Sequence, residues 1–124
     1  MLSVLLLQEA DNVFYTLAGP EISVATTKAY STQLIAAYVL ALQFAKIRSE
    51  ITEEQCDAYV KELKTLPEKI KRILEDKERL QWFASKQANA KDIFFIGRGI
   101  DYAISLEGSL KMKEISYIHS EAYA

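Results

Sequence analysis

Three charged residues recur at helical spacing near the end of the chain: Glu107, Lys111 and Glu114. At about 100° per residue, and with Glu107 set at zero, Lys111 falls at about 40° and Glu114 at about −20° on a helix. The three side chains therefore share one narrow strip, which we call the charged strip. A carboxylate beside an ammonium group can act as a general base where its surroundings let it take a proton at neutral pH.

A salt-bridge ladder is the simpler interpretation of the same spacing, and it would be worth only a few tenths of a kcal/mol per pair. Apolar residues flank the charged strip on both sides, namely Ile104, Leu110 and Ile118. Charges on an apolar face require partners or a ligand. Both interpretations remain open. In the functional one, Lys111 and Glu114 point into a cleft at the end of a strand Ile93–Ile96.

The two carboxylates of the charged strip are expected to differ in role. Glu107 precedes Lys111 by four residues, which favours a stable ion pair. Glu114 lies nearer the carboxyl end of the helix, where the macrodipole disfavours negative charge. We therefore expect Glu114 to be the functional base and Glu107 to support it.

A strand, a glycine turn and a helix are predicted to carry the charged strip. Residues 92–97 form a short apolar, aromatic and β-branched run that is typical of a buried parallel strand. Gly97, Arg98 and Gly99 then predict a turn into a helix over about residues 101–117. In such α/β units ligands lie beyond the carboxyl ends of the strands. This turn lacks the third glycine of the dinucleotide-binding fingerprint. The turn alone therefore does not distinguish a structural role from a ligand-binding one.

The first two thirds of the chain are expected to be mostly helical. We predict a short buried strand at Val13–Leu17, a loop broken at Gly19 and Pro20, and a long helix over Thr27–Ile47. A further helix begins after Thr52 and stops before Pro67. Pro67 then opens another helix, and apolar residues between 80 and 88 indicate a further helical stretch, either separate from it or continuous with it.

Composition excludes several classes of function. The chain has 124 residues, half of them apolar, and 15 basic against 17 acidic side chains give a net charge of −2. These numbers describe one soluble globular domain with no basic patch for nucleic acid, and the apolar runs are too short to cross a membrane. The single cysteine, Cys56, excludes an internal disulfide and makes a reducing cytoplasm the default compartment. We predict no metal and no cofactor.

Two segments of the chain carry a family resemblance. Gly97-Arg98-Gly99 followed by LEGSLKMKEISYIHSEAYA resembles the second sugar isomerase (SIS) domain of the glucosamine-6-phosphate synthase family. The upstream segment AGPEISVATTKAYSTQL resembles the end of the first such domain. This implies a helix-rich α/β fragment of three-layer α/β/α sandwich domains with parallel strands. It also implies three parts: 1–50 from the first domain, 51–90 as a helical interdomain region, and 91–124 as the start of the second.

The resemblance implies an activity and a set of site residues. The family converts fructose-6-phosphate and ammonia into glucosamine-6-phosphate in the cytoplasm, as a homodimer. The position of Glu114 is that of the base that moves a proton between C1 and C2. Lys111 lies beside it in the sugar site, and Glu107 assists Lys111. The substrate-binding residues are then expected to be Val24, Ala25, Thr26, Arg98 and Gly99.

The sequence also departs from the family pattern, which leaves alternatives open. It carries no glutaminase domain, no preceding phosphate-binding loop, and neither the ring-opening histidine nor the terminal lysine of the family. His119 is not that histidine and is expected to be a packed residue. We therefore expect a fragment that is inactive alone. The alternatives are a fragment of a glutaminase-free amino-sugar deaminase or fructosamine deglycase, and a noncatalytic sugar-phosphate sensor, although a sensor has no use for Glu114.

Overall fold

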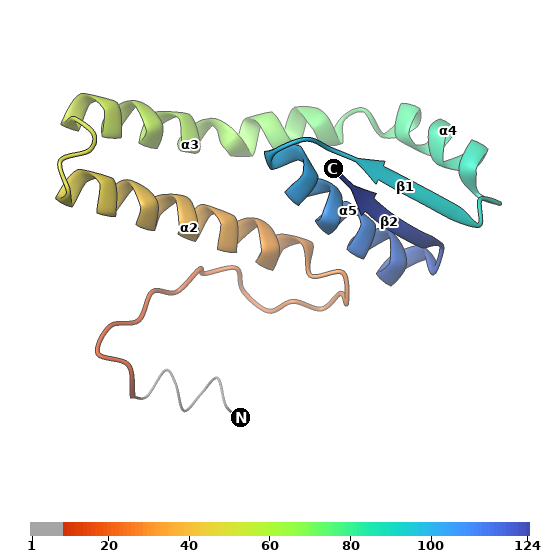
Figure 1. The fold of residues 1–124 in the computed structure, drawn as a ribbon, viewed down its shortest axis with the longest axis horizontal. Helices are drawn as coiled ribbons and strands as arrows, with labels where there is room; N and C mark the ends of the chain where they lie inside the picture. Colours follow the sequence, from red (N-terminus) through yellow and green to blue (C-terminus); the bar gives the residue numbers. More distant parts are fainter. Residues whose placement is uncertain (1–8) are drawn as a thin grey trace. The chain divides into compact units, whose positions relative to one another are not determined.

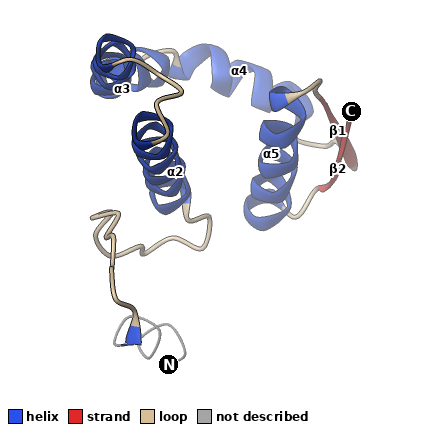
Figure 2. Cartoon of the chain, turned by 60° about the vertical axis from the view of Figure 1, so that its left-hand side comes forward, coloured by secondary structure: helices blue, strands red, loops and turns tan. Residues whose placement is uncertain are grey.

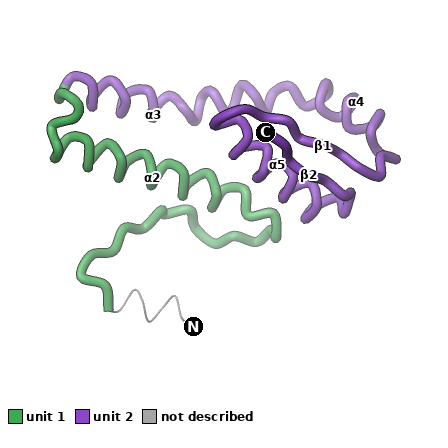
Figure 3. Tube along the Cα trace, viewed as in Figure 1, with its two compact units in different colours: residues 1–53 green, residues 54–124 purple. Residues whose placement is uncertain are grey.

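A computed structural model describes residues 9–124 of the chain, a helix-rich α/β structure with two parallel strands (Figure 1). Residues 1–8 lie outside the described part of the chain. The chain divides into two compact units, the first ending at Glu53 and the second beginning at Glu54 (Figure 3). The expected division into 1–50, 51–90 and 91–124 stays a prediction.

The first unit contains a loop and helix α2, Thr27–Ile47, whose bounds agree with the prediction. The predicted strand Val13–Leu17 is wrong, because these residues form no regular structure. An apolar run becomes a strand only where a neighbouring strand accepts its backbone hydrogen bonds. Among residues 9–124 none pairs with this run, and Leu17 has a positive φ of 55°.

The second unit contains nearly all of the next helix, α3, Glu53–Leu74, and then α4, Lys77–Gln87. Pro67 lies inside α3, so the prediction that a helix stops before it is wrong. A proline removes one backbone hydrogen bond, but the good helix formers on both sides sustain the helix. An ion pair between Lys69 and Glu62 also spans the proline.

The last third of the chain forms a β–α–β unit: β1 (Asp92–Ile96), α5 (Ile100–Ser116) and β2 (His119–Tyr123). The strands are parallel, with Asp92 opposite His119 and Ile96 opposite Tyr123. Strand β1 and helix α5 confirm the sequence prediction, whereas β2 was not predicted. Figure 2 shows α5 lying along one face of the two strands.

Small residues let α5 approach the sheet closely. A Cβ on Gly108 would lie 3.1 Å from the ring of Phe95, and Ser109 is bonded to Ser120 of β2. Side chains alternate along a strand, so Phe94 and Tyr123 lie on the other face, where their ring centroids are 5.8 Å apart.

Within residues 9–124, no helix is both long enough and apolar enough to span a bilayer.

Candidate functional site

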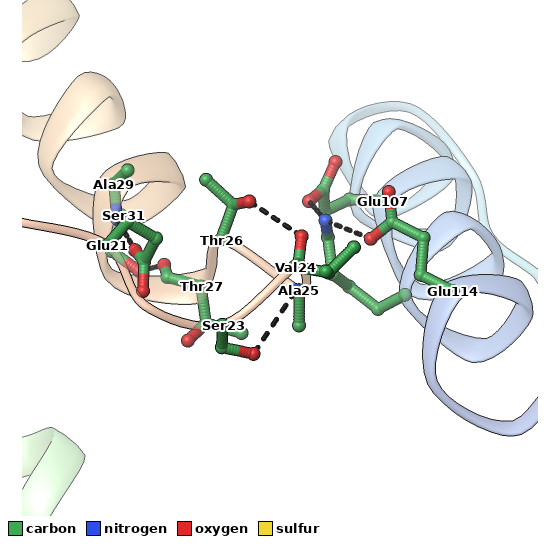
Figure 4. A network of polar contacts seen from close by, with 11 residues as sticks. Glu21, Ser23, Val24, Ala25, Thr26, Thr27, Ala29, Ser31, Glu107 and Glu114 are labelled. Atoms are coloured by element: carbon green, nitrogen blue, oxygen red, sulfur yellow. Dashed lines mark hydrogen bonds and ion pairs between the residues drawn. The ribbon is translucent and has the colours of Figure 1, made fainter.

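The charged strip on α5 forms a connected ionic group. Lys111 Nζ donates a hydrogen bond to Glu114 Oε2 over 2.7 Å and lies 3.4 Å from Glu107 Oε1. Figure 4 labels the two carboxylates, Glu107 and Glu114, and marks these contacts as dashed lines. The three side chains are 20–28% exposed. A lysine held between two acids is a fixed positive charge beside carboxylates that solvent still reaches.

The two carboxylates of the charged strip change the pKa of Lys111. The hydrogen bond to Glu114 raises the pKa of Lys111 above its ordinary value, and Glu107 adds to the rise while desolvation opposes it. Lys111 is therefore a cation throughout the physiological range. The sequence predicted the pair with Glu107, and the structure adds the shorter contact with Glu114.

The charged strip lies on the side of α5 that faces away from the sheet. Gly108 and Ser109 contact the strands, and they fall at about 100° and 200° from Glu107 around the helix. The predicted apolar flank is exposed in the structure, since Ile104 is 60% and Leu110 43% accessible. The sequence predicted that apolar side chains enclose the charged strip, but in the described part of the chain this surface is exposed.

The position of Glu114 along α5 corrects another expectation. Helix α5 begins beside the carboxyl end of β1, where a Cβ on Gly97 would collide with Asp101. By Ser109, bonded to the second residue of β2, the helix is already level with the amino ends of the strands. Glu114 lies five residues further, about 7.5 Å along the axis. It therefore does not point toward the carboxyl end of β1, because α5 runs against the strands.

The turn before α5 depends on two glycines. A Cβ at Gly97 would lie 2.4 Å from the carbonyl of Asp101, and Gly99 has a φ of +60°. The Arg98 carbonyl accepts a hydrogen bond from the Asp101 amide over 3.2 Å. From Gly99 to Lys111 is 12 residues, about 18 Å along a helix. The structure therefore does not bring the predicted binding residues Arg98 and Gly99 together with the charged strip.

The predicted binding loop in the first unit is a tight turn before α2. Ala25 N–H donates to Ser23 Oγ over 3.3 Å, and Thr26 N–H donates to Ser23 O over 3.2 Å. The Thr26 hydroxyl donates to the Val24 carbonyl over 2.7 Å, and Thr26 has a left-handed φ of 55° (Figure 4). Ala25 is buried. The three residues thus form one rigid turn with a defined backbone.

Glu21 is a residue of this loop that the sequence did not single out. Its carboxylate accepts a hydrogen bond from the Ala29 amide in the first turn of α2, over 3.2 Å (Figure 4). An acid there satisfies a free amide and the positive end of the helix dipole. An acid shortly before a long helix was the signal that could have found it. Glu21 therefore ties the loop to α2.

His119 opens β2 and is exposed, so the expectation of a packed residue at a helix end is wrong. Its Nδ1 lies 2.8 Å from Asp92 Oδ1, and its Nε2 lies 3.7 Å from Glu121 Oε1. The contact with Asp92 joins the first residues of the two strands, and the contact with Glu121 lies within β2. The alternation of polar His119 and Glu121 with small Ser120 and Ala122 is the period-two signal that could have predicted β2.

No group of His, Cys, Asp and Glu side chains within residues 9–124 has the arrangement of a metal site.

A surface hollow lies at the junction of α3 and α4, away from the charged strip. Its lining residues are Lys69, Arg72, Ile73, Asp76, Arg79 and Leu80. Two of its basic groups are in ion pairs, Lys69 with Glu62 and Arg79 with Asp76.

Comparison with known proteins finds one matching domain family. Residues 87–124 match the SIS domain. These residues include β1, α5 and β2, and with them the whole charged strip.

Curated relatives match almost the whole chain. It is 58% identical over 116 residues to the glutamine–fructose-6-phosphate aminotransferase (isomerizing) of Caldanaerobacter subterraneus subsp. tengcongensis, and 55% identical over 117 residues to that of Clostridium tetani. Each match covers 94% of this chain. The chain spans only 19% of the length of these relatives.

A solved structure matches as well. The C-terminal domain of glucosamine-fructose-6-phosphate aminotransferase from Francisella tularensis is 41% identical, with a TM-score of 0.91. The match covers 95% of this chain and 33% of that one. The likeness in sequence and in structure is therefore one of common descent.

Proposed function

We propose that this chain, which is homologous to the C-terminal SIS region of glutamine–fructose-6-phosphate aminotransferases, contributes the acid–base group of an aminosugar-forming isomerase. The proposed substrate is fructose-6-phosphate with ammonia, and the product is glucosamine-6-phosphate. The relatives carry this aminotransferase name over chains about five times as long. The proposal concerns the part of the reaction in which a proton moves on the sugar.

The observation that carries the proposal is the contact of Lys111 with both carboxylates of the charged strip. Here one ammonium serves two acids, at 2.7 and 3.4 Å, and leaves a net negative charge on the strip. A partly exposed carboxylate that a lysine holds in a fixed position is accessible to a substrate as a general base.

In the proposed reaction, Glu114 takes a proton from C1 of the sugar. Ammonia first condenses with the C2 carbonyl, with loss of water, to form an imine. Glu114 moves the C1 proton to C2, while the C1 hydroxyl loses its proton and the imine nitrogen gains one. The imine thereby becomes an amine, and the C1 alcohol becomes an aldehyde. Lys111 holds the side chain of Glu114 in place for both transfers through its 2.7 Å hydrogen bond. Glu107 holds Lys111 from the other side.

The remaining proposed contacts concern the sugar phosphate. Val24, Ala25 and Thr26 present a rigid backbone turn, in keeping with binding of sugar hydroxyls. Arg98 and Gly99 lie in the turn at the start of α5, about 18 Å along the helix from Lys111, so we propose them as contacts outside the part of the site that moves the proton. We also propose a homodimer and a cytoplasmic location for the functional protein.

The test is the reaction of the full-length protein that carries this sequence. With glutamine or ammonia and fructose-6-phosphate, it should form glucosamine-6-phosphate, and Lys111→Ala should lose most of this turnover. The 124-residue chain on its own should show no turnover, because catalytic groups that act as a unit lose most of their effect when some are missing.

Two outcomes would contradict the proposal. Binding of fructose-6-phosphate without any conversion would favour a sensor. Release of ammonia from glucosamine-6-phosphate or a fructosamine, with no synthesis in the presence of glutamine or ammonia, would favour a deaminase or deglycase.

A further inference from the structure

Two buried serines join helix α5 to strand β2. Ser120 is fully buried and Ser109 is only 3% exposed. The Ser120 hydroxyl donates to the Ser109 carbonyl over 2.7 Å, and the two hydroxyl oxygens are 3.1 Å apart. A buried hydroxyl normally has a hydrogen-bond partner, and here both partners come from the other element.

This contact is one of two that fix how α5 lies on the sheet. Gly108 lies against the ring of Phe95 on β1, and the next residue, Ser109, is bonded to Ser120 on β2. Consecutive residues of one helix thus contact different strands. Two such points set both the rotation of the helix about its axis and its height along the strands.

The hydrogen bond restrains the helix more tightly than an apolar contact would. Apolar burial is non-directional, whereas a hydrogen bond holds its donor and acceptor to a narrow range of distance and angle. The acceptor here is a backbone carbonyl, so the bond holds the helix itself rather than a side chain.

Rotation of α5 would move the charged strip. Lys111 follows Ser109 by two residues, about 200° around the helix, so it lies on the opposite side from the serine contact. Any turn of the helix about its axis therefore carries Lys111 and Glu114 with it.

We infer that Ser120 is a positioning residue for the charged strip, acting through its hydrogen bond to the Ser109 carbonyl. This inference rests on the proposed function. The geometry required of a proton-transfer group is strict, since a misplacement of about 1 Å can cost about a hundredfold in rate. Ser120 therefore affects turnover without touching the substrate.

The test compares two variants of the full-length protein. Ser120→Ala removes both contacts of the pair, whereas Ser109→Ala removes only its hydroxyl and keeps the carbonyl that Ser120 binds. Ser120→Ala should lower kcat about tenfold, in keeping with a displacement of less than 1 Å. It should change the KM for fructose-6-phosphate less than about twofold, and Ser109→Ala should lose clearly less kcat.

An isotope effect separates positioning from stability. With fructose-6-phosphate deuterated at C1, the isotope effect on kcat should rise in Ser120→Ala, because proton transfer becomes slower relative to other steps. Assays are run well below the unfolding midpoint of each variant, so that a loss of folded protein does not lower kcat. Ser120→Cys keeps a weak hydrogen-bond donor, so its kcat and isotope effect should lie between those of wild type and Ser120→Ala. If Ser120→Ala does not fold, Ser120→Cys is used in its place.

Wild-type turnover tests the proposed function, and the ratio of variant to wild type tests the inference. An unchanged kcat and isotope effect in Ser120→Ala, with only a lower unfolding midpoint, would make Ser120 a structural residue. An equal loss in Ser109→Ala would also overturn the inference, because that variant retains the bond to the carbonyl.

Discussion

Lys111 lies nearer to Glu114 than to Glu107, with its Nζ 2.7 Å from one carboxylate and 3.4 Å from the other. The closer acid is three residues away on α5 and the farther one is four residues away. The carboxylate that we propose as the base is thus also the main partner of the lysine. The lysine must therefore position the base while leaving it able to take a proton.

The protonation of Lys111 should depend more on Glu114 than on Glu107. The hydrogen bond to Glu114 is the largest cause that raises the pKa of Lys111. Glu114→Gln should therefore lower the lysine pKa more than Glu107→Gln does. NMR titration of the Lys111 side chain in the two variants checks this order, and an equal or reversed effect would contradict it.

The raised pKa of Lys111 also predicts how stability depends on pH. The folded state holds the lysine proton more tightly than the unfolded state, so this stabilisation is fully present below the ordinary lysine pKa of about 10.4. It is lost as pH rises through the higher folded value. Lys111→Met should remove this alkaline component from urea unfolding curves collected between neutral and strongly alkaline pH. A loss of the same size in wild type and variant would assign the pH dependence to other groups.

Gly97→Ala should destabilise the β–α–β unit more than Gly108→Ala does. The new Cβ at residue 97 would lie 2.4 Å from the Asp101 backbone, which cannot move without shifting α5. Overpacking of this kind costs about 1–3 kcal/mol or more. At residue 108 the nearest atom is 3.1 Å away on the Phe95 ring, and alanine also improves helix propensity. Urea unfolding monitored at residues of this unit gives the order of stability of the two variants. A Gly97→Ala variant as stable as wild type would refute the close approach of residue 97 to the Asp101 backbone.

Pro67→Ala should stabilise α3. Proline inside a helix costs about 3 kcal/mol, of which its effect on the unfolded chain returns about 0.4–1 kcal/mol. Because Pro67 lies inside α3, a net gain of about 2–2.6 kcal/mol is expected on the same principles. Thermal unfolding followed by circular dichroism measures it, with Glu68→Ala as the neighbouring control. A lower midpoint in Pro67→Ala alone would show that the proline has a tertiary role.

The sequence predicted the elements whose signal is local. Helix α2 and strand β1 follow from an unbroken apolar pattern and from β-branched and aromatic residues, and α5 follows from a glycine turn. The charged strip followed from periodicity alone, because three residues on one helix keep their relative angles in any fold. The sequence could not show which acid the lysine approaches more closely, since this depends on side-chain rotamers.

The sequence failed where a neighbour decides the outcome. Val13–Leu17 has the composition of a strand, but a strand forms only with a partner, and the described part of the chain supplies none. Strand β2 has weak β propensity, yet pairing with β1 and the buried Ser120 hold it in place. The direction of α5 against the strands was implicit in the β–α–β order. It places Glu114 near the amino ends of the strands rather than at the end of β1 that the sequence suggested.

Solvent-deuterium incorporation into the sugar by the full-length protein tests most directly whether Glu114 is the base. In deuterated water, Glu114→Gln should bind fructose-6-phosphate with nearly wild-type affinity, because the amide keeps the shape of the carboxyl group. It should incorporate no deuterium at the transferred position, because the base is gone. The matched variant Glu107→Gln should keep most of the incorporation while binding the sugar less tightly or unfolding more easily. Undiminished incorporation in Glu114→Gln would contradict the account and leave Glu114 as a structural charge.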